Sequence, residues 1–125
     1  MAKTIKREIG DYGENLAVDF LAKKGYKIVA RNFLITGGEL DIIAWQNDEL
    51  VFVEVKTRKN IYYGYPEEGV TFFKKEKMAK AIRRYLLTLP NIPYYRVDII
   101  AVELNMAKKL VNIKQIKNVF CDFEV

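Results

Sequence analysis

Two acidic residues and a lysine occur in two apolar segments that are close together in the sequence. Asp41 lies in the segment from Gly37 to Ala44, and Glu54 and Lys56 lie in the segment from Val51 to Arg58. Carboxylates bind hard cations such as Mg²⁺, and a nearby lysine can stabilise negative charge that develops on a phosphate. These residue types therefore predict metal-assisted phosphodiester hydrolysis, in which a bound cation supplies activated water without histidine.

A β-hairpin would bring these side chains onto one face. Both segments are rich in β-branched and apolar residues, and the polar stretch 46–49 between them can turn the chain. A two-residue loop and a four-residue loop give the same register. The facing pairs are then Trp45 with Leu50, Ile43 with Phe52, Asp41 with Glu54, and Glu39 with Lys56.

Opposed carboxylates need a compensating charge. At about 4 Å their repulsion is on the order of 1 kcal/mol in water and about 4 kcal/mol when partly buried. Such an arrangement does not help folding, so we expect a hard divalent cation such as Mg²⁺ between Asp41 and Glu54. The alternative is that Lys56 and other bases neutralise two acids on a solvated sheet face. The metal interpretation is favoured because both strands are strongly apolar.

The composition narrows the chemistry further. The chain has no histidine, no serine and one cysteine, Cys121, which argues against serine–histidine hydrolysis and histidine or cysteine zinc sites. A lone cysteine cannot form an internal disulfide, so we expect Cys121 to be a packed thiol in a reducing compartment. No secretion signal or membrane span is evident, which leads us to expect a cytoplasmic protein.

Length and charge are consistent with a small protein that binds an anionic partner. We expect residues 1–125 to form a single domain, since 125 residues that are 50% hydrophobic can bury a core without disulfides. The formal net charge is +5. This positive charge favours an anionic partner but does not identify it, because many basic proteins bind nothing specific.

Apolar periodicity predicts the elements around the hairpin. We expect a turn at 36–38, a loop over 60–66, strands over 26–34, 96–104 and 110–116, and helices over 4–24 and 71–89. The stripe of the first helix comprises Ile9, Tyr12, Leu16, Ala17, Phe20 and Leu21, and Gly25 ends the helix. Glu14 borders this stripe, so it either faces Asp41 and Glu54 or lies on the surface.

Several basic and aromatic residues are candidates for binding nucleic acid. Tyr62 and Tyr63 lie in the loop beyond Arg58 and Lys59, where their rings would stack on bases or lie along a backbone. The alternative is a loop that packs its own rings. Two basic residues, one on the first predicted strand and one on the second predicted helix, are further candidates. The alternative is that each is an ordinary solvated charge on the surface. These two are Arg31 and Lys74.

The same residues resemble a known family, the YraN-type bacterial proteins, which are similar to archaeal Holliday-junction resolvases and to the wider PD-(D/E)XK nuclease superfamily. The resemblance extends roughly to residue 104. It rests on Gly13-Glu14, Gly38-Glu39-Leu40-Asp41-Ile42-Ile43-Ala44, Val53-Glu54-Val55-Lys56-Thr57-Arg58, the helix 74–86 and Arg96-Val97-Asp98. It implies an α/β fold with a restriction-endonuclease-like αβββαβ core, in which helices flank a central mixed sheet.

The resemblance also implies roles for individual residues. Asp41 and Glu54 would bind Mg²⁺ or Mn²⁺, the backbone carbonyl of Val55 would add a ligand, and Glu14 would be a further acid of the metal site. Lys56 would orient or help to deprotonate the attacking water. The chain departs from the superfamily pattern at Leu40, which occupies the position of the proline in the superfamily name.

The function expected from these observations is a metal-dependent endonuclease acting on DNA, including branched or otherwise structured DNA. A non-catalytic module that binds nucleic acid or protein on a nuclease fold is the main alternative. A Schiff-base lyase built on Lys56 is weaker, because the adjacent acids would keep its amine protonated. A homodimer is a further expectation, since similar resolvases make paired cuts as dimers and the apolar tail from Val119 to Val125 could join an interface.

Overall fold

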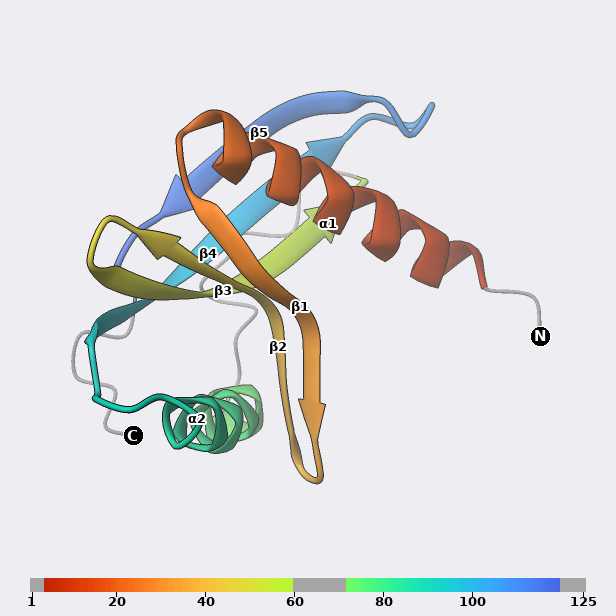
Figure 1. Cartoon of the computed structure of the whole chain (residues 1–125). Helices are drawn as coiled ribbons and strands as arrows, with labels where there is room; N and C mark the ends of the chain where they lie inside the picture. Colours follow the sequence, from red (N-terminus) through yellow and green to blue (C-terminus); the bar gives the residue numbers. More distant parts are fainter. Residues whose placement is uncertain (1–3, 60–71, 120–125) are drawn as a thin grey trace.

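Two helices and five strands follow one another in the computed structural model of the chain, which describes residues 4–59 and 72–119 (Figure 1). In chain order the elements are α1 (Ile5–Lys23), β1 (Lys27–Ile35), β2 (Gly38–Gln46), β3 (Glu49–Arg58), α2 (Phe72–Leu86), β4 (Tyr94–Leu104) and β5 (Leu110–Ile116). The predicted helices and strands are confirmed, with one notable difference in length. The second helix ends at Leu86, because the N–H groups of Thr88 and Leu89 donate to carbonyls three residues earlier in a tightened last turn before Pro90.

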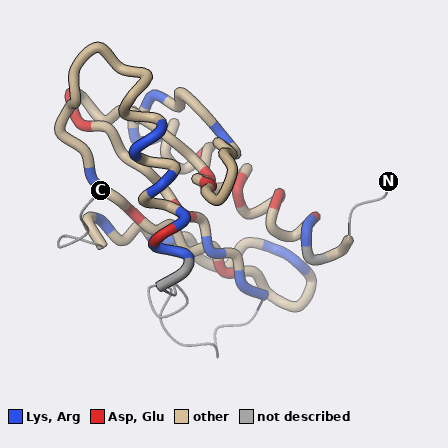
Figure 2. The backbone as a smooth tube through the Cα atoms, turned by 90° about the horizontal axis from the view of Figure 1, so that it is seen from below, with Lys and Arg blue, Asp and Glu red and all other residues tan. Residues whose placement is uncertain are grey.

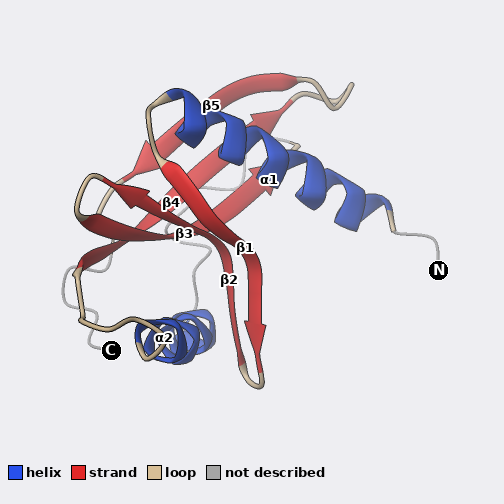
Figure 3. Ribbon diagram, in the orientation of Figure 1, coloured by secondary structure: helices blue, strands red, loops and turns tan. Residues whose placement is uncertain are grey.

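The strands form one sheet with a helix on each face. The sheet order is β1-β2-β3-β4-β5, and only the β3–β4 pairing is parallel. Figure 3 shows α1 and α2 on opposite sides of this sheet. The expected mixed sheet flanked by helices is confirmed, and the arrangement is compatible with a restriction-endonuclease-like core to which β5 adds an edge strand.

The central strand β3 distributes its side chains between two apolar cores. Leu50 and Phe52 belong to the core under α2, whereas Val51 and Val53 belong to the core under α1. Side chains alternate along a strand, so Glu54 follows Phe52 onto the α2 side of the sheet. Burial by the helices thus explains why this strand is apolar up to the position of the acid.

The β2–β3 hairpin has the predicted register only over part of its length. Its two-residue turn contains Asn47 in the left-handed conformation (φ 53°), and the pairs run from Gln46 with Glu49 to Ile42 with Val53. The prediction that this register continues past the pair of Ile42 with Val53 is wrong. The pairs of Asp41 with Glu54 and of Glu39 with Lys56 are not formed, because β2 leaves β3 beyond Ile42 and stays paired with β1 alone.

A glycine explains where the diverging strand goes. Beyond Ile42, the β1–β2 hairpin extends down beside α2 (Figure 1). A Cβ on Gly38 would lie 2.7 Å from the backbone carbonyl oxygen of Lys77 and 3.1 Å from the backbone nitrogen of Ala81. Only glycine permits this approach of β2 to the α2 backbone, and the approach opens a fork between β2 and β3.

The helix α1 packs across the other face of the sheet. The side chain of Thr4 caps it by accepting a hydrogen bond from the backbone N–H of Arg7 (3.1 Å), and Gly25 (φ 91°) follows its end. Most of the predicted stripe is covered by the sheet, but Tyr12 is 41% exposed. Its assignment to the buried stripe was wrong, because the N-terminal part of α1 extends past the strands (Figure 1).

A polar network joins the strands where β3 and β4 begin, and it extends along β4 to Asp98, which pairs with Val53. Asp98 is fully buried and accepts hydrogen bonds from the side chains of Arg96 and Gln115 and from the backbone N–H of Asn118. The Arg96 guanidinium also contacts side chains of β2, β3 and the residue before β1, namely Gln46, Glu49 and Tyr26. The network therefore joins β2, β3, β4 and β5 to one another and to Tyr26, the residue before β1.

Neither described helix combines the length and the apolar character that a membrane-spanning helix needs.

Candidate metal and phosphate site

A large cleft lies beside the point at which β2 leaves β3. Its volume is about 1000 Å³, and its walls come from the first half of α1, the β1–β2 hairpin and the end of β3. The polar and charged residues that line it include Asp11, Glu14, Asn32, Glu39, Asp41, Lys56, Thr57 and Lys59. The cleft thus collects Glu14, Asp41 and Lys56, which the sequence had assigned to one site.

Asp41 lies at the base of the fork. Its Oδ2 accepts a hydrogen bond from the backbone N–H of Val55 (2.8 Å). The carboxylate therefore takes the place of the backbone partner that β3 loses when β2 departs. This contact fixes Asp41 beside the residue that follows Glu54, so the two acids are close even though they are not paired in the ladder.

Glu54 is the most deeply buried acid at this site. Its side chain is 3% exposed, and its Oε1 lies 3.0 Å from Nζ of Lys74 in the first turn of α2. Its Oε2 is buried and has no hydrogen-bond partner in the described part of the chain. An unpartnered carboxylate oxygen inside a protein is costly, and a bound cation is one way to satisfy it.

Burial and charge repulsion perturb this carboxyl group. Burial, followed by repulsion from Asp41, raises the pKa of Glu54 from 4.5 to about 7, although Lys74 and Lys56 oppose the rise. The pKa of Lys74 is itself raised despite its burial, by the charges and hydrogen bonds of Glu54 and Glu39. The protonated and ionised forms of Glu54 are therefore both accessible near neutral pH when no cation is present.

This shift predicts a pH dependence of stability in EDTA. Between about pH 4.5 and pH 7 the folded protein retains a proton on Glu54 that the unfolded chain has lost, so the free energy of unfolding falls as pH rises. The contribution is on the order of 2–3 kcal/mol. Urea unfolding at about pH 5 and about pH 8 should show this fall in wild type and a smaller one in Glu54→Gln. Equal falls in both proteins would contradict the assignment.

Glu14 lies on the α1 side of the cleft and has its own cationic partner. Its Oε1 accepts from Nε of Arg31 (3.1 Å) and from the side-chain amide of Asn32 (3.2 Å), and the residue is 7% exposed. Burial raises the pKa of Glu14, the Arg31 hydrogen bond opposes the rise, and repulsion from Asp41 adds to it. Of the two placements left open by the sequence, the structure has Glu14 inside the cleft near Asp41.

Gly13 allows α1 to approach β3 next to Glu14, which gives a paired prediction. A Cβ on Gly13 would lie 1.8 Å from Oγ1 and 2.8 Å from Cβ of Thr57, whereas a Cβ on Gly10 would meet nothing within 4 Å. Because Thr57 is stiff and β-branched, Gly13→Ala should push α1 away and destabilise the protein by about 1–3 kcal/mol.

Gly10→Ala is the matched control, since it should stabilise the same helix by about 0.5–1 kcal/mol. Chemical denaturation of the two variants checks both values. A Gly13→Ala protein as stable as Gly10→Ala would show that the close contact is unimportant.

The remaining candidates fall into three groups. Lys56 and Lys59 line the cleft, and Arg58 is half-buried at the end of β3. Arg31 and Lys74, which the sequence assigned to nucleic-acid binding, contact the acids Glu14 and Glu54. The third group comprises Tyr62, Tyr63, Cys121 and most of the tail 119–125, which lie outside the described residues.

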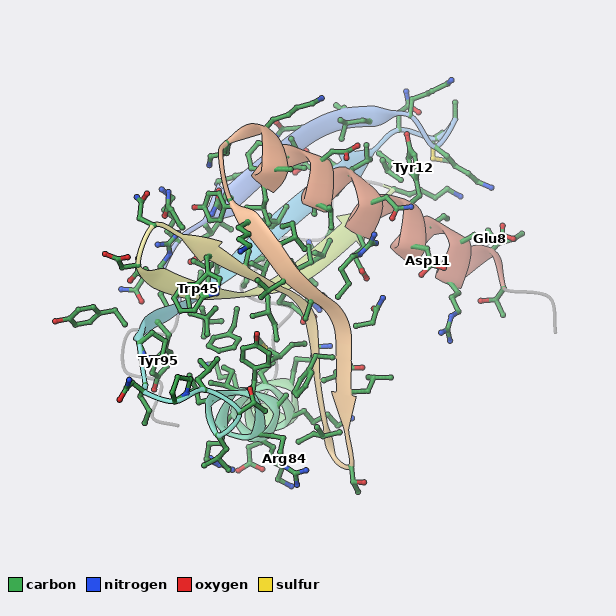
Figure 4. The ribbon with its side chains drawn as sticks, in the orientation of Figure 1. Glu8, Asp11, Tyr12, Trp45, Arg84 and Tyr95 are labelled. Atoms are coloured by element: carbon green, nitrogen blue, oxygen red, sulfur yellow. The ribbon has the colours of Figure 1, made fainter. Side chains whose placement is uncertain are left out.

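The sequence analysis did not anticipate the contact of Lys74 with Glu54 and Glu39. The signal for it is helical spacing, since Lys74 precedes the buried Met78 by four residues and so lies above it on the inner side of α2. Figure 2 shows that lysines and arginines are spread along α2. Arg84 points away from the sheet (Figure 4), and Lys77, Lys80 and Arg83 are exposed as well.

The donor set suits a cation that keeps water ligands. Within residues 4–59 and 72–119, no three acidic, histidine or cysteine side chains are grouped closely enough to hold an ion by themselves. Mg²⁺ is commonly held by one or two carboxylates and completed by water and substrate phosphate. Asp41 and the unpartnered oxygen of Glu54 are consistent with this mode of Mg²⁺ binding.

Comparison with known proteins gives a consistent result. The model of the uncharacterised protein family UPF0102 matches residues 13–102. A UPF0102 protein of Caldicellulosiruptor saccharolyticus is 42% identical over 117 residues, covering 92% of this chain and 98% of the relative. UPF0102 proteins of Clostridium botulinum and Caldanaerobacter subterraneus are also 42% identical, covering 91% and 96% of this chain and 94% and 100% of the relatives.

Proposed function

The chain belongs to the uncharacterised protein family UPF0102, and from the geometry of its cleft we propose that it hydrolyses phosphodiester bonds in DNA with Mg²⁺ or Mn²⁺. The family membership confirms the resemblance to YraN-type proteins that the sequence indicated. The printed names of the family and of these relatives state no reaction. The reaction is therefore inferred from the residues that line or adjoin the fork.

One observation carries the proposal. Glu54 combines a buried, unpartnered Oε2 with an adjacent acid, Asp41, which lines an open cleft. Burial and repulsion both disfavour the ionised carboxylate, and the ion pair with Lys74 opposes them without returning the pKa of Glu54 to its ordinary value. A divalent cation bound by both acids would offset the two costs together.

Each residue of the site would have a distinct role in cation binding or in hydrolysis. Asp41 and Glu54 would hold the cation, and the backbone carbonyl of Val55 and the carboxylate of Glu14 are the further ligands that the resemblance implies. When bound, the cation supplies a polarised phosphate oxygen and water of lowered pKa. Lys56 would orient the attacking water and stabilise negative charge on the phosphate in the transition state.

The substrate class follows from charge and shape. A net charge of +5 and a cleft of about 1000 Å³ with Lys56 and Lys59 on its walls are suited to a polyanion. DNA, including branched or structured DNA, is the substrate that the family resemblance favours.

We include a homodimer in the proposal. Light scattering on the chain lacking residues 119–125 tests whether the tail contributes to the dimer interface. A truncated chain that remains a well-folded dimer would show that the tail is not needed for dimerisation.

The test compares wild type with Glu54→Ala and Lys56→Ala on branched, nicked, single-stranded and duplex DNA in Mg²⁺ or Mn²⁺. The proposal requires cleavage of at least one substrate by wild type and loss of that cleavage in both variants. Wild type no more active than the variants on every substrate would contradict it. If DNA then binds with steep salt dependence, and with the same affinity in Asp41→Ala and Glu54→Ala, the chain is a binding module.

A further inference from the structure

Lys74 connects α2 to two different strands beside the fork. Its Nζ lies 3.0 Å from Oε1 of Glu54 on β3 and 3.0 Å from Oε1 of Glu39 on β2. The Lys74 side chain is 23% exposed, which is far less than expected for a lysine that serves only as a solvated charge. The ammonium group therefore spans the gap that opens where β2 leaves β3.

The contact with Lys74 determines which oxygen of Glu54 remains available. The terminal torsion of a glutamate side chain has a broad, twofold energy profile, so its two oxygens are normally free to rotate. In Glu54 one oxygen is bonded to the ammonium group and the other is buried without a partner among the described residues. The ion pair thus removes the rotational freedom of the carboxylate.

We propose that Lys74 is a positioning residue that holds Glu54 so that its Oε2 is presented to a divalent cation. Glu39 is the second anchor of the ammonium group and holds it from the β2 side. The inference rests on the proposed metal site and adds to it a residue from α2. It also replaces the role of phosphate ligand that the sequence suggested for Lys74.

A simple counter-charge would behave differently from a positioning residue. If Lys74 only neutralised Glu54, its removal would increase the negative charge of the site and tighten cation binding. If Lys74 orients the ligand atom, its removal weakens cation binding, as loss of an outer-shell partner commonly does. The sign of the change in affinity therefore separates the two roles.

The experiment is a titration of the full chain with Mn²⁺, without nucleic acid, at one fixed alkaline pH and ionic strength, with unbound Mn²⁺ followed by electron paramagnetic resonance. Lys74→Gln should weaken Mn²⁺ binding by about 10–100-fold. Lys74→Arg should restore most of the affinity, because a guanidinium can also bridge two carboxylates. The matched control is Lys77→Gln, an exposed lysine of the same helix, which should leave the affinity unchanged.

Unchanged or tighter Mn²⁺ binding by Lys74→Gln would overturn the proposal. If Lys74→Gln does not fold, Glu39→Gln provides the test, since Glu39 is 44% exposed in its side chain and its loss should weaken Mn²⁺ binding several-fold. Unaltered affinity in that variant would overturn the proposal equally.

The outcome is also separable from that of the proposed reaction. Mn²⁺ binding that depends on Lys74 in a protein that cuts no DNA would refute the nuclease and support the positioning role. If wild type cleaves DNA but its Mn²⁺ affinity does not change when Lys74 is replaced, the nuclease is supported and the positioning role is refuted. If wild type binds no Mn²⁺, both proposals are overturned.

Discussion

Glu54→Gln will lower the rate of DNA hydrolysis by at least about 10³-fold while leaving the fold intact. A cation that polarises a phosphate contributes several kcal/mol to transition-state stabilisation, and each 1.4 kcal/mol corresponds to about tenfold in rate. Glutamine has nearly the same shape as glutamate but lacks the negative charge that would hold the ion. The measurement is the single-turnover cleavage rate in Mn²⁺ on whichever DNA substrate wild type cuts best.

The controls for this prediction separate chemistry from folding. Glu54→Gln should be at least as stable as wild type in EDTA above pH 7, because it removes a buried charge whose pKa is about 7 in wild type. Glu103→Gln, on the neighbouring strand β4, should cleave at the wild-type rate. Retention of full activity by Glu54→Gln would show that the buried carboxylate takes no part in the reaction.

Asp98→Ala will destabilise the protein by about 3–5 kcal/mol, a large fraction of the stability of a small domain. The substitution leaves Arg96 without the carboxylate that it contacts at 3.0 Å, in surroundings where the arginine side chain is only 9% exposed. It also removes the acceptors for Gln115 and for the backbone N–H of Asn118. Urea unfolding followed by circular dichroism measures the loss.

The control for Asp98→Ala is a second acid in the same network. The Glu49 side chain contacts Arg96 but is 39% exposed, so Glu49→Gln should cost at most about 1 kcal/mol. Similar losses in the two variants would mean that burial does not determine the strength of this network. Cation affinity should be unaffected by Glu49→Gln, because Glu49 is the first residue of β3, five positions before Glu54, and does not line the cleft.

Local pattern was sufficient to predict the elements and the centre of the β2–β3 hairpin. Alternation in β3 and the two-residue turn at Asn47 fix the register around Ile43 and Phe52, so those pairs could be read from the sequence. The prediction that the same register continues beyond Ile42 was wrong. Its failure depends on the approach of Gly38 to the α2 backbone, a contact between segments about 40 residues apart that no local pattern encodes.

The candidate site shows the same division between local and tertiary information. The sequence indicated that Asp41, Glu54 and Lys56 belong together, and the structure brings Asp41 to the backbone of Val55 and Lys56 into the same cleft. The sequence raised neutralisation of the acids by Lys56 and other bases as an alternative, but it did not identify Arg31 as the partner of Glu14 or Lys74 as the partner of Glu54. Such pairs depend on how helices dock on the sheet, which composition and periodicity do not specify.

The buried role of Asp98 was likewise left open by the sequence. An acid within the apolar strand from Arg96 to Leu104 is equally consistent with a site residue and with a structural one. Its partners come from β4, β5 and the segment after β5, so only the assembled sheet identifies it as part of a closed network. Asp98 pairs in register with Val53 beside the fork, but its carboxylate is engaged by Arg96, Gln115 and the backbone of Asn118, which separates it from the proposed chemistry.

The most direct test of the account is anomalous diffraction from a crystal soaked in Mn²⁺. We predict a peak of anomalous density at the base of the fork, within about 2.0–2.2 Å of a carboxylate oxygen of Asp41 and of Oε2 of Glu54. Bound Mn²⁺ only at other acids, or an empty fork in crystals of a protein that is active in the same Mn²⁺ concentration, would contradict the metal site on which the proposed function depends.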